Sequence, residues 1–287
     1  MALSLQQTKR RINNVNSTRK ITNAMYLVAT AKYKSYKNKM DNTSLYADEL
    51  LLAMNQVMQS LSEDQVKDAL TLSNDPKNRN LFIIVSSSLG LCGGYNNNLF
   101  KEVNKHLNKD DELLVIGTKG YSYYSKRGFE LDPSYVSLMT NYNINSVRKV
   151  KNRIESALKN GEVNKVYVAY TKFVNSITFE PVIEEIYPID PSSISKELSV
   201  KEKNTLIEPD HKRVLSYLVP LYLESIINAR IIESNASEQA TRRNAMESAT
   251  DNADEIIKNL QVEYNKARQS SITQEITEIV AGANAQE

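Results

Sequence analysis

The sequence has few of the residues on which metal and thiol chemistry depends. Its 287 residues include one cysteine, Cys92, and two histidines, His106 and His211. A single cysteine excludes an internal disulfide and a cysteine-based zinc site, and it fits a reducing compartment. With so few histidines, no Ser-His-Asp arrangement is visible. The sequence therefore predicts no catalytic site, no metal site and no cofactor.

Long apolar runs are also lacking. The longest, Leu81 to Val85, is far shorter than the roughly 20 residues that a membrane-spanning helix needs. The N-terminal stretch is polar behind its basic residues, whereas a signal peptide has an apolar segment there. We therefore expect a soluble intracellular protein.

Glycine and proline are absent from two long stretches, one near each end of the chain. They run from about Leu3 to Leu61 and from Leu221 to Ala281. Both residue types disfavour helix interiors, so their absence favours two long helices. Pro220 precedes the second stretch, either in the first turn of the helix or at a kink, and Gly282 reads as a helix stop.

Each of these helices carries residues spaced alternately by three and four, which is typical of a coiled-coil seam. The simplest arrangement pairs the two helices with each other, antiparallel. The first seam is Ile12, Val15, Arg19, Thr22, Tyr26, Ala29, Tyr33, Tyr36, Met40, Thr43, Ala47, Leu50, Met54, Val57 and Leu61. The second is Tyr222, Ser225, Ala229, Ile232, Ala236, Gln239, Arg243, Met246, Thr250, Ala253, Ile257, Leu260, Tyr264 and Ala267.

The middle of the chain has a different pattern, in which short apolar runs alternate with helix-like stretches. This alternation predicts a small α/β domain with a largely parallel, Rossmann-like sheet. We predict a coiled-coil helix over 1–62, the α/β domain over 75–205 and a second coiled-coil helix over 209–283. The expected strands are Asn80 to Ser86, Glu112 to Ile116, Lys165 to Tyr170 and an alternating edge strand at Ile177 to Tyr187.

Two motifs in the middle of the chain resemble chemical sites, a phosphate-binding loop and a pair of carboxylates, but their details do not favour either. The turn from Gly90 to Gly94 lies between a strand and a helix, as phosphate loops do, but it lacks the Gly-Lys-Ser/Thr ending. A tight turn, with Cys92 as a small buried residue, is the better interpretation. Glu184 and Glu185 are adjacent, so on a strand they face opposite sides and cannot act as a pair. We expect both to be solvated or edge charges.

Charge is distributed unevenly at the N-terminus. The first 40 residues contain nine lysines or arginines and no acidic residue, and the first acid is Asp41. Such a stretch is suited to an acidic protein surface or to nucleic acid, and the residues alone favour neither. Near the other end, Ile272, Ile276, Ile279 and Val280 form an apolar stripe. This stripe is either a frayed end or a plug for an apolar socket in another protein.

Three separated motifs resemble the gamma subunits of F-type ATP synthases. They are the opening helix from Arg11 to Lys32, the turn GLCGGYNNNL from Gly90 to Leu99, and the segment from Ser237 to Ala283. The last follows the family pattern almost residue for residue. The resemblance covers the chain from about Leu3 to Ala283, which leaves no room for a transit peptide.

The resemblance implies a bacterial central-stalk rotor subunit without catalytic activity. In that family the helix pair stands inside a hexamer of alpha and beta subunits, and the α/β domain faces the epsilon subunit and the proton-carrying ring of the membrane. The resemblance implies a peripheral location on the cytoplasmic side of the cell membrane, with no nucleic acid and no small-molecule substrate bound directly. Within the family, a shaft in an ATPase paralogue not coupled to proton transport is the alternative.

The resemblance also implies which side chains contact partners. By position these are Arg268, Gln269, Thr273 and Glu275 near the tip, with Met25, Glu238 and Arg242 in mid-shaft, contacting the ring or across the coil. Asn23 and Glu247 replace basic residues that are usual in the family, and Arg243 replaces an apolar seam residue. A coiled-coil protein that binds nucleic acid through its basic helix is the alternative from another class.

Overall fold

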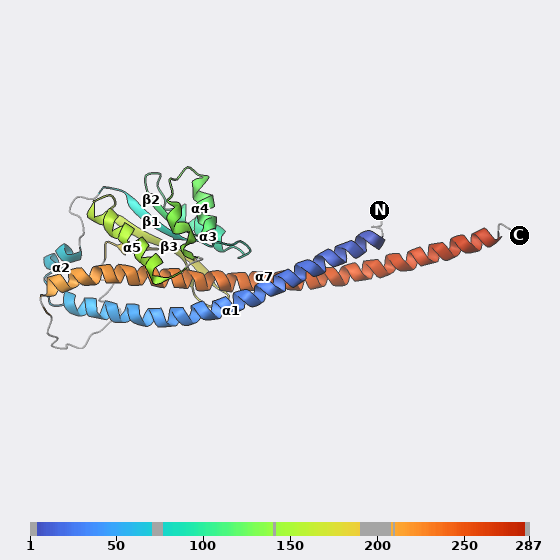
Figure 1. Ribbon diagram of the computed structural model, residues 1–287, viewed down its shortest axis with the longest axis horizontal. Helices are drawn as coiled ribbons and strands as arrows, with labels where there is room; N and C mark the ends of the chain where they lie inside the picture. The colour runs from blue at the N-terminus through green and yellow to red at the C-terminus, as the bar shows by residue number, and fades with distance from the viewer. Residues whose placement is uncertain (1–4, 71–76, 140–141, 190–207, 209, 285–287) are drawn as a thin grey trace. The chain divides into compact units, whose positions relative to one another are not determined.

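The computed structural model describes residues 5–70, 77–139, 142–189, 208 and 210–284. It divides into two compact units, to which the two longest helices both contribute. Unit 1 is Met1–Thr30 with Arg242–Glu287, and unit 2 is Ala31–Thr241. The helices are α1 (Leu5–Met58) and α7 (His211–Asn284), which carry the blue and red ends of the chain in Figure 1.

Unit 1 is an antiparallel pair formed by the first part of α1 and the second part of α7. The hydroxyl of Thr250 donates to that of Thr22 at 2.8 Å, and Arg19 pairs with Asp254 at 2.9 Å. Residue numbers on α7 rise as those on α1 fall, so the helices run in opposite directions. The predicted seams are confirmed, since each of their residues is buried or half-buried along both helices.

Unit 2 contains a four-stranded sheet in the order β2-β1-β3-β4. β1 pairs in parallel with both β2 and β3, whereas β4 is an antiparallel edge strand. The mainly parallel sheet with an edge strand confirms the predicted α/β fold. The strands are β1 (Asn80–Val85), β2 (Glu112–Ile116), β3 (Lys165–Phe173) and β4 (Phe179–Tyr187).

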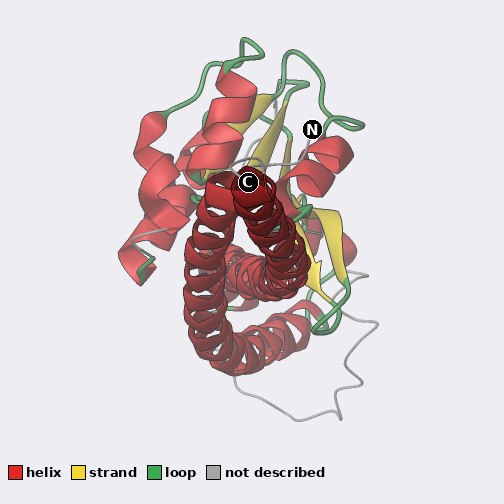
Figure 2. Ribbon diagram, turned by 90° about the vertical axis from the view of Figure 1, so that its right-hand side faces the viewer, coloured by secondary structure: helices red, strands yellow, loops and turns green. Residues whose placement is uncertain are grey.

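The side chains of the central strands are apolar on both faces, so each face of the sheet is covered by helices (Figure 2). One face packs against α3 and α4, and the other against α5, α2 and the long helices. A 3-10 helix, η1, contacts β2. These elements are α2 (Glu63–Leu70), α3 (Tyr95–Val103), α4 (Thr118–Ser125), η1 (Pro133–Met139) and α5 (Ile144–Lys159).

Several helices begin where a side chain caps their first turn. Ser62 and Gln65 bond to each other's backbone N–H groups, a capping box that starts α2. Asn143 accepts from the Ser146 N–H at the start of α5, and Asp210 accepts from the Arg213 N–H at the start of α7. Helix α2 was not predicted, although its capping box was visible in the sequence.

The structure changes or decides three predictions about the ends of the long helices. α1 ends at Met58 rather than at residue 62, because the chain turns before the capping box of α2. Pro220 lies inside α7 and not in its first turn, which was one of the two predicted positions, because the cap at Asp210 starts the helix ten residues earlier. Gly282 lies inside α7 as well, which extends to Asn284, so this glycine is not the helix stop.

By length and composition α7 could cross a membrane, which was not predicted, and the core helix of a soluble protein can have the same length and composition. In its first part Leu215, Val219, Leu223 and Ile227 are fully buried in the core of unit 2. Internal packing therefore accounts for part of this apolar composition.

The close packing of α4 on β2 and on the residue that follows β1 allows a test of the core. A Cβ at Gly120 would lie 2.5 Å from Ser86 Oγ and 2.8 Å from Val115 Cγ1. We expect Gly120→Ala to lower the free energy of unfolding by about 1–3 kcal/mol, because the overpacked site must move apart. The control is Ser122→Ala on the exposed side of the same helix, with a change within about 0.5 kcal/mol. Urea unfolding followed by circular dichroism measures both, and equal effects would contradict the packing.

Candidate functional site

Basic side chains line α1 in both units; we call residues 9–39 the basic segment. In unit 1, Arg19 is paired with Asp254, whereas Lys9, Arg10, Arg11 and Lys20 are exposed and form no ion pair with any described residue. In unit 2, Lys32 and Lys34 are likewise exposed and unpaired among the described residues. Lys37 pairs with Asp41 at 2.8 Å, and Lys39 lies near the ring of Tyr142. The basic segment thus presents unpaired positive charge to other molecules.

The tyrosines of the basic segment do not form a platform for stacking bases. Tyr26, Tyr33 and Tyr36 are half-buried on the seam, as predicted, and the ring of Tyr33 lies 5.9 Å from that of Phe173. The pKa of Tyr36 is raised mainly by burial and to a smaller extent by the negative charge of Glu238. These aromatics therefore belong to the interior of the protein, which favours a protein surface over nucleic acid as the partner of the basic segment.

The apolar stripe near the end of α7 is exposed. Continued from the Thr22–Thr250 pair, the register of unit 1 places Leu5, the first described residue of α1, opposite Ala267. The tip of α7, which we define as 268–284, therefore extends past the described part of α1. Its large apolar side chains are open to solvent: Ile272 is 47% exposed, Ile276 56%, Ile279 71% and Val280 52%.

The residues expected to contact partners near the tip are exposed too. Arg268 and Gln269 lie on the surface, Thr273 donates to the Gln269 carbonyl at 2.9 Å, and Glu275 accepts from Ser271 at 3.3 Å. These hydrogen bonds stay within one or two turns of α7, so the outward face of the tip remains available. Contact of these four residues with a partner stays a prediction.

The mid-shaft residues are placed differently. Glu238 and Arg242 are both buried, and Met25 is half-buried. The carboxylate of Glu238 accepts from the Gln239 side chain at 3.3 Å and faces the tyrosines Tyr36 and Tyr95 of unit 2. Glu238 was expected to contact either the ring or a group across the coil. Its burial favours an interaction inside the chain. Its contact with a partner stays a prediction, as does that of Met25 and Arg242.

The three departures from the family pattern also have definite places. Asn23 and Glu247 are exposed, whereas Arg243 is half-buried at its seam position. The guanidinium of Arg243 donates to the neighbouring Asn244 side chain, at 3.2 Å from Nε and 3.0 Å from Nη2. The arginine thereby keeps polar partners while its aliphatic part occupies the seam.

The Gly-rich turn is closed by its own hydrogen bonds. Asn96 accepts from the Ser87 N–H at 3.0 Å and donates to the Ser87 hydroxyl at 2.7 Å. Cys92 is buried, as predicted, and Gly93 has a positive φ of 56°. Leu91 also has a positive φ, of 59°, and its side chain is exposed. Among the described residues no group of three or more metal-ligating side chains is found.

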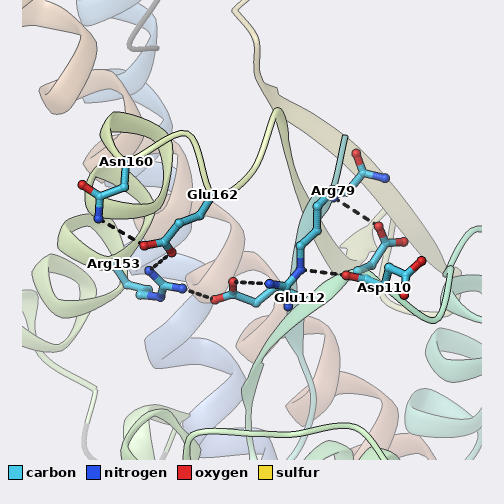
Figure 3. A network of polar contacts seen from close by, with 8 residues as sticks. Arg79, Asp110, Glu112, Arg153, Asn160 and Glu162 are labelled. Atoms are coloured by element: carbon cyan, nitrogen blue, oxygen red, sulfur yellow. Dashed lines mark hydrogen bonds and ion pairs between the residues drawn. The ribbon is translucent and has the colours of Figure 1, made fainter. Parts of the chain in front are cut away.

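Two hollows of about 330 Å³ each lie in unit 2. One is lined by uncharged residues at the start of α3, the β3–β4 turn and α7, among them Gly94, Thr171 and Thr241. The other lies beside Arg153, whose guanidinium binds Glu112 at 2.5 Å and Glu162 at 2.8 Å (Figure 3). Hydrogen bonds from Asn160 and then Arg153 lower the pKa of Glu162. Arg153, Glu112 and Glu162 thus satisfy one another beside the second hollow.

Sequence reasoning missed a buried polar stretch of α7. The ten residues from Ile231 to Ala240 are all buried, although Glu233, Ser234, Asn235, Ser237, Glu238 and Gln239 are polar. Glu184 was also expected to be a solvated or edge charge, but it forms an ion pair with Arg230 of α7 at 2.5 Å. Glu185 is an exposed edge charge paired with Lys165. The mixture of small and polar residues in this stretch was the available signal.

The fold and its surfaces define a class of protein: a pair of long antiparallel helices with an α/β domain inserted between them and open surfaces suited to protein partners. A family model described as ATP synthase matches residues 4–286. The ATP synthase gamma chain of Mycoplasma capricolum is 38% identical over 282 residues, covering 98% of both chains. That of Alkaliphilus metalliredigens is 36% identical over 290 residues, covering 99% of both chains. The chain belongs to the ATP synthase gamma-chain family.

Solved structures agree with this fold. A chain in the central stalk and c-ring structure of Tetrahymena thermophila mitochondrial ATP synthase has a TM-score of 0.55 and 25% identity, and it covers 80% of this chain and 99% of its own. A chain of the Euglena gracilis mitochondrial ATP synthase has a TM-score of 0.68 at 13% identity, with 98% and 94% covered. The second likeness concerns the fold alone.

The exposure of the tip leads to a stability test. We expect Ile276→Ala to change the free energy of unfolding by no more than about 0.5 kcal/mol, because the side chain is already in water. Leu260→Ala, at a seam position that is 5% exposed, should cost about 2–5 kcal/mol. Chemical unfolding of the full chain, followed by circular dichroism, compares the two. A large loss for Ile276→Ala would mean that the tip packs within the chain.

Proposed function

We propose that this chain is the central-stalk rotor subunit of a bacterial F-type ATP synthase. It couples ion flow through a ring of membrane subunits to ATP synthesis or hydrolysis in a hexamer of alpha and beta subunits. Membership in the gamma-chain family carries this proposal. The open surfaces of the helix pair support it, since a rotor must contact partners along its length.

The proposed partners match the surfaces that the chain leaves open. The apolar tip fits an apolar sleeve at the top of the hexamer, and the basic segment fits acidic segments of the catalytic subunits. The α/β domain faces the epsilon subunit and the c-ring. The complex is peripheral to the cell membrane on its cytoplasmic side, and protons are the transported ion.

The chain itself contributes no catalytic group in this proposal. Its effect on catalysis arises because each orientation of the rotor binds some conformations of the surrounding subunits better than others. Met25, Glu238, Arg242, Arg268, Gln269, Thr273 and Glu275 are the proposed contact residues.

Shortening the tip tests the proposal. In the reconstituted complex, a chain ending at Ala267 should pump severalfold fewer protons per ATP hydrolysed, because it lacks the apolar side chains of the tip and the four contact residues. A chain ending at Ala281 keeps these side chains and serves as the matched control. Nucleotide binding to isolated catalytic subunits should stay unchanged. Hydrolysis of ATP by the isolated chain at the rate of the complex would refute the proposal.

Charge reversal tests the basic segment. We expect Lys32→Glu with Lys34→Glu to weaken binding of the chain to the alpha and beta subunits, because both lysines are exposed and unpaired among the described residues. The loss should be about tenfold at low salt and smaller at high salt, where exposed charges are screened. Lys126→Glu, exposed at the end of α4, is the control. Binding measured by surface plasmon resonance at two salt concentrations decides, and an equal loss at both would argue against an electrostatic contact.

A further inference from the structure

The sheet of unit 2 has the topology that in other α/β proteins leaves a crevice for ligands. The chain leaves β1 for β2 on one side and later enters β3 on the other side, so the strand order reverses between β1 and β3. In open α/β sheets, ligands bind at the carboxyl ends of the strands at such a point. Here β1 ends at Val85, whereas β3 continues past it to Phe173.

A segment of α7 occupies that position. The Ser234 hydroxyl is fully buried, donates to the Val85 carbonyl at 3.5 Å and accepts from the Thr171 N–H at 3.4 Å. It also lies 2.7 Å from the hydroxyl of Tyr95, a residue in the first turn of α3. One serine of α7 thereby joins the ends of both strands and the helix that follows β1.

The neighbouring residues of α7 continue the same pattern. Phe173 lies two residues beyond Thr171 on β3, and its N–H donates to Glu233 at 3.1 Å. Two backbone groups past the end of β1, which a strand partner normally satisfies, are thus bonded to α7 side chains. Arg230 then donates from Nη2 to Glu184 of β4 at 2.7 Å and from Nη1 to Glu233 at 3.2 Å. Its Nε lies 2.5 Å from the Glu184 carboxylate without forming a hydrogen bond.

These contacts differ in kind from those nearer the start of α7. From Leu215 to Ile227 the buried side chains of α7 are mainly apolar, and apolar contacts are non-directional. The polar contacts near there, Glu224 with Arg148 and Asn228 with Tyr142, join side chains alone. Hydrogen bonds to fixed backbone groups depend on angle, and Arg230, Glu233 and Ser234, at helical spacings of three and four, lie on one face of α7. Rotation of α7 about its own axis would break them together.

We propose that Arg230, Glu233 and Ser234 of α7, with Tyr95 of α3, form a lock that prevents α7 from turning against the α/β domain. The lock lies at the carboxyl ends of β1 and β3, where other α/β proteins bind ligands. Its residues act on coupling only by holding α7 in position on the domain. This inference rests on the proposed function, because a rotor must pass torque from the domain to its helices without slip. Its chemistry is internal to the chain, so it needs no ligand.

Removal of single hydroxyls tests the lock. In the reconstituted complex, Tyr95→Phe and Ser234→Ala should lower proton pumping per ATP hydrolysed at least twofold against an imposed gradient, with ATP hydrolysis unchanged. In single-molecule rotation with the hexamer fixed to a surface, a probe attached to the α/β domain should fluctuate over a wider range of angles. The loss in the double variant should be smaller than the sum of the two single losses, since both variants remove the bond between Tyr95 and Ser234.

Two controls separate the lock from general stability. Tyr124→Phe removes another buried hydroxyl of unit 2, one without a hydrogen-bond partner among the described residues, and should change neither pumping nor fluctuation. Arg153→Gln breaks the ion pairs of Figure 3, which join α5, β2 and the loop after α5 but not α7. Arg153→Gln should lower the free energy of unfolding and leave proton pumping per ATP hydrolysed unchanged, whereas Arg230→Gln should lower the pumping.

Hydrogen exchange of the isolated full chain distinguishes this inference from the proposed function. The Thr171 amide should exchange faster in Ser234→Ala and Tyr95→Phe but not in Tyr124→Phe. Unchanged exchange overturns the lock, whatever the complex does. Faster exchange with unchanged pumping and fluctuation overturns its role in coupling and leaves the rotor function intact. If the parent chain supports no pumping, the proposed function fails, and with it the role of the lock in coupling.

Discussion

The structure depends on α7 packing against α1 in unit 1 and also against the sheet in unit 2. Along unit 1 it is a partner of α1 through one stripe of side chains, and its other faces are exposed. Along unit 2 it must also pack on the sheet, so that ten consecutive residues from Ile231 to Ala240 are withdrawn from water. A helix that is buried all round normally has an apolar sequence. This one is largely polar there, and the polar groups therefore determine how the domain and the helix fit together.

Burial of such groups is unfavourable unless each finds a partner, and a partner removed from a buried group costs more than the bond contributes. Ser234, Glu233 and Arg230 of α7 find partners in the Tyr95 side chain, the backbone of β1 and β3, and the carboxylate of Glu184. The hydroxyl of Ser237 and the Nε of Arg230 form no hydrogen bond with described residues. Apolar contacts are non-directional, whereas hydrogen bonds depend on angle. We therefore interpret the polar stretch as the feature that sets the register between helix and sheet.

The difference between what the sequence predicted and what it missed follows from the range of the interactions. Seam residues such as Thr22 and Thr250 were found because a helix repeats its contacts every three or four residues, which is a local pattern. Strands were found because Leu81 to Val85 is a local apolar run. Ser234 was missed because its partners Tyr95 and Val85 are 139 and 149 residues away, and the mixture of small and polar residues around it does not say which serine is buried. For Pro220 the sequence left the first turn and a kink open, and the Asp210 cap excludes the first turn.

The same reasoning explains why the family resemblance was needed for the partners. The tip of α7 and the basic segment are features without a counterpart inside the described chain, since Ile279 and Val280 lie in water and Lys32 and Lys34 form no ion pair with described residues. Physical chemistry says what such surfaces require, an apolar socket and an acidic surface, but it names neither. Relatives that match nearly the whole chain supply the names. The names come from relatives because the partner of an open surface is encoded in another molecule's sequence.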